Sequence, residues 1–240
     1  MIKFFRRIRQ NLITENKFSK YLLYAIGEIV LVVIGILIAL SLNNWNEKQN
    51  LKAEEIKLLK EMKVALLSDK ADIISNIEEH SSAAKSCAIL LTAISNKLPY
   101  NDSLDFHFAN ALNTTKFSQI SSPYETLKIK GPDLIENDSL RLFLNDYYDN
   151  SIRYQFAIQN SSQRAFDAAK ERQFELFTSL RFWDKMKPVS YEELLENKYY
   201  ISWLTYTVGE RNWETSTFRK LNEKIDRLLH LLDIEIKKSN

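Results

Sequence analysis

Residues 21–42 form one unbroken apolar run, YLLYAIGEIVLVVIGILIALSL, in which Glu28 is the single charged residue. As an α-helix this run is about 33 Å long, which matches a bilayer hydrocarbon core of about 30 Å. Tyrosines stand near its start and Trp45 follows its end, where aromatic rings prefer the headgroup layer. The run predicts a transmembrane helix, and it divides the remaining chain into residues 1–20 and 43–240.

Positive charge is concentrated before the apolar run. Residues 1–20 hold six lysines and arginines against one glutamate, whereas the segment NNWNEKQN after the run is neutral. Because basic flanks stay in the cytoplasm, we expect a cytoplasmic N-terminus on the inner membrane and a periplasmic domain from residue 43 to residue 240. The basic residues favour an amphipathic helix lying on the anionic inner leaflet, and a flexible arm that only sets topology is equally consistent with them.

A cleaved signal peptide is the alternative to a permanent anchor. Ala39-Leu40-Ser41 places small residues at the spacing of a cleavage site. However, the apolar core of a signal peptide spans only about 7–15 residues, and this run is longer. We therefore expect an uncleaved transmembrane helix.

Glu28 is costly within a bilayer, so its surroundings on the helix matter. Gly35 and Ala39 follow seven and eleven residues later, within about 20° of the Glu28 direction. Two small residues four apart let another helix approach closely. The face formed by Glu28, Gly35 and Ala39 predicts contact with another membrane protein or with a second copy. Simple tolerance of Glu28 near the headgroups and a proton pathway are the alternatives, and one carboxylate cannot form a relay by itself.

Two stretches of the chain closely resemble a bacterial domain-of-unknown-function family of single-pass inner-membrane proteins. They are FFRRIRQNLITENKFSKYLLYAIGEIVLVVIGILIALSLNNWNE at residues 4–47 and SPYETLKIKGPDLIENDSLR at residues 122–141. The resemblance implies a membrane-anchored protein with no assigned activity. It carries over no catalytic or binding residue.

The sequence from Trp45 to Leu98 contains no glycine or proline and has a heptad pattern. The positions that recur every seven residues are Leu59, Leu66, Ile73, His80, Cys87 and Ile94. Met62, Ala83 and Leu90 occupy the second heptad position, which Asp69 and Asn76 interrupt. An imperfect heptad predicts a long helix packed inside a bundle rather than a free coiled coil.

Capping and turn residues delimit further helices. The predicted segments are a short helix capped by Asn101 or Asp102, a helix capped by Ser122 and ended by Gly131-Pro132, a long helix over 139–180 capped by Asp138, a helix opened by the Ser190–Glu193 capping box, and a final helix over 199–237 with a kink at Gly209. The stripe of the 139–180 helix includes Tyr147, Tyr154 and Ile158. The predicted buried edge of the final helix consists of Phe218, Leu221, Ile225, Leu228 and Leu232. We therefore predict an all-α fold: one N-terminal transmembrane helix followed by an antiparallel bundle of long helices.

Motifs for catalysis, metals and cofactors are missing from the sequence. None of the three histidines has a second histidine at ligand spacing, and four glycines cannot supply the known phosphate-binding loops. His80 reads as a core residue, and Cys87 reads as a buried thiol. We predict no enzyme activity, no cofactor and no metal. Nucleic acid is not expected as a partner, because residues 43–240 are slightly acidic.

Two surfaces of the outer domain are candidate binding sites. The first is an aromatic-rich set: Tyr147, Tyr148, Phe182, Trp183, Tyr199, Tyr200, Trp203, Tyr206 and Trp213. These rings could form a groove for a peptide or small ligand, or could fill gaps between helices. The second is the segment 121–138 with Tyr124, Glu125, Lys128 and Gly131, which is either a binding segment or a simple linker.

Two hypotheses about function follow from these observations. The first is a non-enzymatic interaction or scaffold module that holds a periplasmic bundle at the membrane and associates with itself or another membrane protein. The second is a ligand-binding sensory bundle that signals through a partner, since only about 20 residues precede the predicted span. The chemistry of any small-molecule ligand is left open by the sequence.

Overall fold

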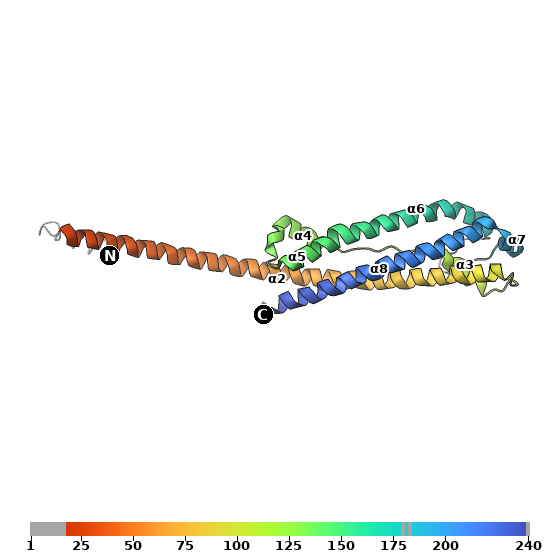
Figure 1. Ribbon diagram of the computed structural model, residues 1–240, viewed down its shortest axis with the longest axis horizontal. Coiled ribbons are helices and arrows are strands. Elements are labelled where there is room, and N and C mark those ends of the chain that lie inside the picture. Colours follow the sequence, from red (N-terminus) through yellow and green to blue (C-terminus); the bar gives the residue numbers. More distant parts are fainter. Residues whose placement is uncertain (1–17, 179–180, 182–183, 239–240) are drawn as a thin grey trace. The chain divides into compact units, whose positions relative to one another are not determined.

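The structure of the protein is a computed structural model that describes residues 18–178, 181 and 184–238 (Figure 1). Within these ranges there is no β-strand, and the nearest approach to one is an isolated bridge between Phe177 and Pro188. The elements are α2 (Phe18–Ser95), α3 (Leu104–Ala111), α4 (Ser122–Lys130), η1 (Pro132–Leu134), α5 (Asp138–Asn145), the π-helix η2 (Asp146–Ser151), α6 (Ile152–Leu176), α7 (Tyr191–Glu196) and α8 (Lys198–Lys238). The predicted all-α fold is confirmed.

The chain divides into two compact units, residues 1–54 and residues 55–240. The described part of the first unit is helical throughout, and most of its apolar side chains from Leu22 to Leu42 are exposed within the unit. In the part of the chain that the structure describes, this is the one helix long and apolar enough to cross a membrane. The predicted basic arm falls on residues 1–20, of which residues 1–17 lie outside the described residues.

The second unit is built on three long helices, namely α6, α8 and the part of α2 from residue 55 onward (Figure 1). Two pairs set the direction of α8 against α2: Lys63 contacts Asp233 at 2.6 Å, and His80 contacts Glu214 at 2.9 Å. Because the residue numbers rise on one helix as they fall on the other, α8 is antiparallel to α2. The predicted antiparallel arrangement of long helices is confirmed.

The heptad positions predicted on α2 are buried, and their polar interruptions have a structural role. Asp69 and Asn76 are each 1% exposed. Asp69 accepts a hydrogen bond from the backbone N–H of Ile120 at 2.9 Å, and Asn76 accepts one from the hydroxyl of Thr115 at 2.9 Å. The extended segment 113–121 between α3 and α4 is therefore fastened to α2 at the two positions where the heptad fails.

The predicted helix over 139–180 is real but is interrupted by the π-helix η2 and ends at Leu176. A π-turn adds one residue to the helix and rotates everything after it by about 100°. Tyr147, which lies within η2, is fully buried. After η2, Tyr154 is 58% exposed and Gln155 is 2% exposed. The prediction that Tyr154 points inward is wrong, because a uniform 3.6-residue period does not include this extra residue.

One predicted helix cap is confirmed, and three are shifted by one or two residues. Ser103 rather than Asn101 or Asp102 is the N-cap of α3, and Ser121 rather than Ser122 is the N-cap of α4. The side chain of Ser190 accepts from the N–H of Glu193, as the capping box predicts. At α5, Asn137 rather than Asp138 is the cap, and its side chain accepts from the N–H of Leu140 at 3.0 Å. Helix α8 continues through Gly209 without interruption.

The second unit contains two hydrophobic clusters. The first includes Leu66, Ile73, Tyr147, Phe218 and Ile225. The second includes Cys87, Leu90, Phe108, Tyr200 and Leu204. On α2 the apolar residues of the first cluster precede His80 and those of the second follow it, so a layer of polar side chains separates the clusters.

Candidate functional site

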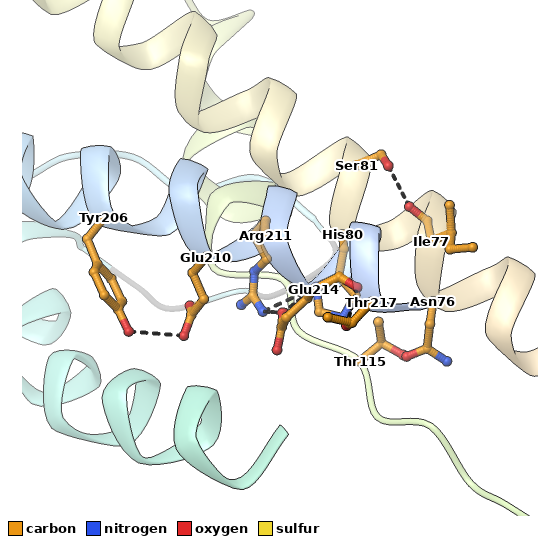
Figure 2. A network of polar contacts seen from close by, with 10 residues as sticks. All are labelled: Asn76, Ile77, His80, Ser81, Thr115, Tyr206, Glu210, Arg211, Glu214 and Thr217. Carbon is orange, nitrogen blue, oxygen red and sulfur yellow. Dashed lines mark hydrogen bonds and ion pairs between the residues drawn. The ribbon is translucent and has the colours of Figure 1, made fainter. Parts of the chain in front are cut away.

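The polar layer between the two clusters consists of His80 from α2 with Arg211 and Glu214 from α8 (Figure 2). The Nδ1 of His80 lies 2.9 Å from Oε2 of Glu214, and Nη1 of Arg211 donates to the same oxygen at 2.9 Å. All three residues are at most 3% exposed. Figure 2 shows the three side chains converging in the space between the two helices.

The position of Arg211 and Glu214 follows from the spacing on α8. Leu204, Thr207, Arg211, Glu214 and Phe218 recur at intervals of three or four residues, so they share one buried face. Burial raises the pKa of the Glu214 carboxyl, but the hydrogen bond from His80 and the charges of His80 and Arg211 outweigh burial, and the pKa falls to about 2. The carboxylate is therefore ionised at neutral pH.

Sequence reasoning missed these two residues. The predicted buried edge of the last helix began at Phe218, although the same 3/4 spacing continues backward through Glu214 and Arg211. The signal that the sequence offered was two charged residues, Arg211 and Glu214, on an otherwise apolar stripe of the last helix. His80 was expected to be a core residue, and the structure places it in the core.

The side of α8 next to the polar layer faces α6. Figure 2 shows Tyr206, Glu210 and Arg211 along one face of α8, and the Tyr206 hydroxyl contacts Glu210 at 3.2 Å. Burial raises the pKa of the Glu210 carboxyl, in spite of the charge of Arg211. The groove between α6 and α8, which we call the α6–α8 groove, holds two cavities on this side.

The larger cavity of the α6–α8 groove has a volume of about 490 Å³. Its α6 wall is made of small residues, Ala165, Ala168 and Ala169, and its α8 wall includes Tyr199, Trp203 and Tyr206. Arg172 also lines this cavity, with its guanidinium 4.8 Å from the centre of the Tyr199 ring. We call this the Trp203 cavity. Small residues on one wall and large rings on the other leave room for a helix or a chain segment.

The smaller cavity of the groove has a volume of about 190 Å³, and we call it the Trp213 cavity. Its lining includes Tyr154 and Gln155 from α6, and Trp213, Lys220 and Lys224 from α8. Part of the predicted aromatic set therefore lies in the two cavities. Tyr147, Tyr148 and Tyr200 instead fill the core, as the packing interpretation expected, and Phe182 and Trp183 lie outside the described residues.

The segment predicted as a possible binding site, 121–138, packs onto the bundle. Tyr124 is 3% exposed; its hydroxyl donates to Asp149 at 2.6 Å, and its ring stacks on Tyr148 with centroids 4.3 Å apart. Glu125 and Lys128 are exposed and form an ion pair at 2.8 Å.

Gly131 ends α4 with a φ of 100°, a conformation that glycine adopts without strain. The segment thus has a structural anchor at Tyr124, and Glu125 and Lys128 are among its exposed polar side chains.

The predicted membrane contact face lies in the first unit. Gly35 and Ala39 are exposed there, Glu28 is partly exposed, and no heavy atom lies within 4 Å of a Cβ added at Gly35. The space beside Gly35 is therefore not filled by packing within its own unit.

Neither a metal site nor a reactive thiol is evident among the described residues. No group of three or more histidine, cysteine, aspartate or glutamate side chains in the described ranges could hold a metal ion. Cys87 is fully buried, and burial raises the pKa of its thiol to about 12, so the thiolate is scarce at neutral pH.

These features define an all-α protein with one helix that could cross a membrane and a helical bundle divided by a buried ionic layer. The chain belongs to DUF6090, a family of unknown function whose model matches residues 28–152. The family predicted from the two sequence stretches is thereby confirmed as a domain-of-unknown-function family. No curated protein and no solved structure matches the chain. The α6–α8 groove lies almost entirely beyond the matched residues.

Proposed function

We propose that the protein is a membrane-anchored, non-enzymatic interaction module whose bundle binds a helix of a partner protein in the α6–α8 groove. The single observation that carries this proposal is the Trp203 cavity, an open volume of about 490 Å³ with alanines on one wall and aromatic rings on the other. Tyrosine and tryptophan dominate the binding energy of many protein interfaces. Alanines let a second backbone approach closely, as in other helix-in-groove complexes.

Charge narrows the chemistry of the partner. The lining of the Trp203 cavity includes Arg172 and no aspartate or glutamate. The lining of the Trp213 cavity adds Lys220, whereas its other lysine, Lys224, is paired with Asp146. A groove with cationic rims favours an acidic segment. The proposed occupant is therefore an amphipathic helix whose apolar face packs on Trp203 and whose acidic residues meet Arg172.

The anchor gives this module its location. The apolar part of α2 could span a membrane, and the basic residues before it favour an N-terminus in the cytoplasm and a bundle in the periplasm of a bacterial inner membrane. A reporter enzyme that works only in the periplasm, fused after Asn240, should be active. Activity of a cytosolic reporter at the same position would contradict this topology.

Site-specific photocrosslinking in membranes tests the partner groove. A photoreactive amino acid at Ser202, which lines the Trp203 cavity, should form an adduct with an acidic helical segment, identified by mass spectrometry. The same amino acid at Asn212, which is exposed on α8 and lines neither cavity, is the matched control. Arg172→Glu should abolish the Ser202 adduct. An equal yield at Asn212, or an adduct with a second copy of the chain, would overturn the proposal of a heterologous partner.

A specific observation also favours the second candidate function, a ligand-binding sensory bundle that signals through a partner. The Trp213 cavity combines aromatic side chains with a few polar groups, as small-molecule sites do. A ligand for this cavity should raise the melting temperature of the full-length chain. A chain whose melting temperature no small organic anion changes would leave the interaction module as the sole candidate.

A further inference from the structure

The chemistry of the Trp213 cavity is specific enough to identify a class of ligand. We propose that this cavity binds a small aromatic carboxylate, with its ring against Trp213 and Tyr154 and its carboxylate at Lys220 and Gln155. The proposal gives the second candidate function its ligand. It does not depend on the partner groove around Trp203, so either one can fail without the other.

Aromatic side chains form the apolar part of the cavity. Trp213 is 46% exposed and Tyr154 is 58% exposed, although both line a concave surface of the bundle. Tyr154 stands there because the π-helix η2 ends at Ser151 and turns α6 relative to the stripe predicted for it. Rings held in this way can stack on a flat ligand. π-helical turns are also frequent at functional sites, where they redirect side chains.

The charge on the cavity wall calls for an anion. Lys224 already pairs with Asp146, whose carboxylate lies 2.6 Å from its ammonium, and it also donates to Ser151 at 2.7 Å. Lys220 has no ion pair within the described part of the chain, and no carboxylate lines the cavity. One positive charge is thus left without a partner, which matches a ligand carrying a single negative charge.

A buried hydrogen-bond donor, the side-chain amide of Gln155, is an independent indication of a ligand. Gln155 is only 2% exposed, it lines the cavity, and its amide Nε2 has no hydrogen-bond partner among the described residues. An unpaired buried amide N–H costs free energy, and native structures usually provide an acceptor for it. A carboxylate oxygen in the cavity provides such an acceptor when the Gln155 amide, which solvent does not reach in the structure, turns toward it. Thr217, by contrast, already donates its hydroxyl hydrogen to the carbonyl of Glu214 at 2.8 Å.

The volume limits the size of the ligand. A protein cavity of about 150 Å³ is large enough to take up one benzene molecule. The Trp213 cavity, at about 190 Å³, therefore has room for one ring and one small polar group. Inorganic anions, by contrast, leave the two rings without a contact.

Titration of the full-length chain in detergent with benzoate tests the proposal. Binding is followed by tryptophan fluorescence, with Trp213→Phe identifying the part of the signal that arises at the cavity. We expect saturation with a dissociation constant below about 1 mM. Benzamide, which has the ring without the charge, and acetate, which has the charge without the ring, should each bind at least about tenfold more weakly.

Variants separate a built site from unspecific attraction. Lys220→Gln and Gln155→Leu should each weaken benzoate binding about fivefold or more. Arg219→Gln is the matched control, because Arg219 is exposed beside Lys220 and lines neither cavity, and it should leave binding unchanged. The melting temperature of each variant shows whether it is folded. Absence of saturation in the wild-type chain, equal binding of benzamide, or a Lys220→Gln variant that binds like the wild type would overturn the proposal.

Discussion

His80 and Glu214 contact each other at 2.9 Å in the interior of the bundle, and each side chain is at most 2% exposed. The contact joins α2 to α8 at the level where one hydrophobic cluster ends and the other begins. Since apolar side chains can slide past one another more easily than an ion pair can, the contact favours one register of the two helices. Arg211 supplies the positive charge that balances the ionised carboxylate of Glu214.

Removing the carboxylate from this layer should be strongly destabilising. Glu214→Gln leaves Arg211 as a buried charge without its partner, and breaking a buried pair in this way costs about 3–5 kcal/mol. Chemical denaturation of the wild type and the variant measures the loss. Asp226→Asn is the control, because Asp226 pairs with Lys70 at a surface position, where such pairs contribute less than about 1 kcal/mol.

A second variant distinguishes whether the polar layer contributes to the stability of the bundle or to the register of α2 and α8. His80→Leu, Arg211→Met and Glu214→Leu together replace the layer with apolar side chains, and such replacements are often neutral or stabilising. We expect the triple variant to be clearly more stable than Glu214→Gln. A triple variant that is no more stable than Glu214→Gln would show that the layer has a role beyond charge pairing.

Asp69 predicts a pH dependence of the opposite sign from that of an ordinary paired carboxylate. Burial raises the pKa of Asp69 to about 6 from its usual value near 4, even though Ile120 and Tyr147 donate hydrogen bonds to it. Between about pH 4 and pH 6 the folded chain therefore holds a proton that the unfolded chain has lost. The free energy of unfolding should fall as the pH rises through this window, by on the order of 3 kcal/mol.

Asp69→Asn tests this pH dependence. Relative to the wild type, the variant should gain stability between pH 4 and pH 7, as measured by urea denaturation across that range. Asp233→Asn is a control of opposite sign, because the hydrogen bond from Lys63 lowers the pKa of Asp233. Its contribution is present at neutral pH and is lost as the pH falls. Parallel profiles for Asp69→Asn and the wild type would contradict the raised pKa.

The sequence predicted most of the fold because the long helices carry strong periodic patterns. Leu59, Leu66 and Ile73 are buried as the heptad indicates, and Ser190 caps α7 as its motif indicates. The helix over 139–180 was predicted without its π-turn, because one inserted residue leaves no local signal in a single sequence. The first turn after Ser151 is therefore rotated relative to the prediction, and Tyr154 was placed on the wrong face, whereas Ile158 is buried as predicted.

The candidate site was harder to predict than the fold. Trp203, Tyr206 and Trp213 were recognised as candidate contact residues from their composition alone. Their grouping with Arg172, Lys220 and Gln155 depends on the packing of α6 against α8, which joins residues far apart in the sequence. The buried pair of Arg211 with His80 likewise depends on a contact between α2 and α8, so no local motif marks it.

Two glycines predict opposite responses to the same substitution. Gly131 has a φ of 100°, which an alanine side chain tolerates poorly, so Gly131→Ala should destabilise the chain by about 1–3 kcal/mol. Gly209 lies inside α8 with no heavy atom within 4 Å of an added Cβ, so Gly209→Ala should stabilise it by about 0.5–1 kcal/mol. Thermal denaturation of both variants measures the two effects. Equal shifts of the same sign would contradict the backbone conformations described here.

The apolar helix has a predicted contact face for another transmembrane helix. Glu28, Gly35 and Ala39 are proposed to meet another transmembrane helix, either of a partner or of a second copy. Glu28→Leu and Gly35→Leu should each reduce crosslinked oligomers or partner recovery from membranes, because the first removes a polar contact and the second fills the notch beside it. Both variants should still insert, since leucine lowers the cost of insertion.

Val30→Leu is the matched control for these two variants. Val30 lies two residues after Glu28, about 200° away around the helix, so leucine there adds bulk on the opposite face. Crosslinking of intact cells followed by membrane fractionation reports association and insertion together. If Glu28→Leu and Gly35→Leu crosslink as strongly as Val30→Leu and the wild type, association does not use this face, and the bundle alone must carry the interaction.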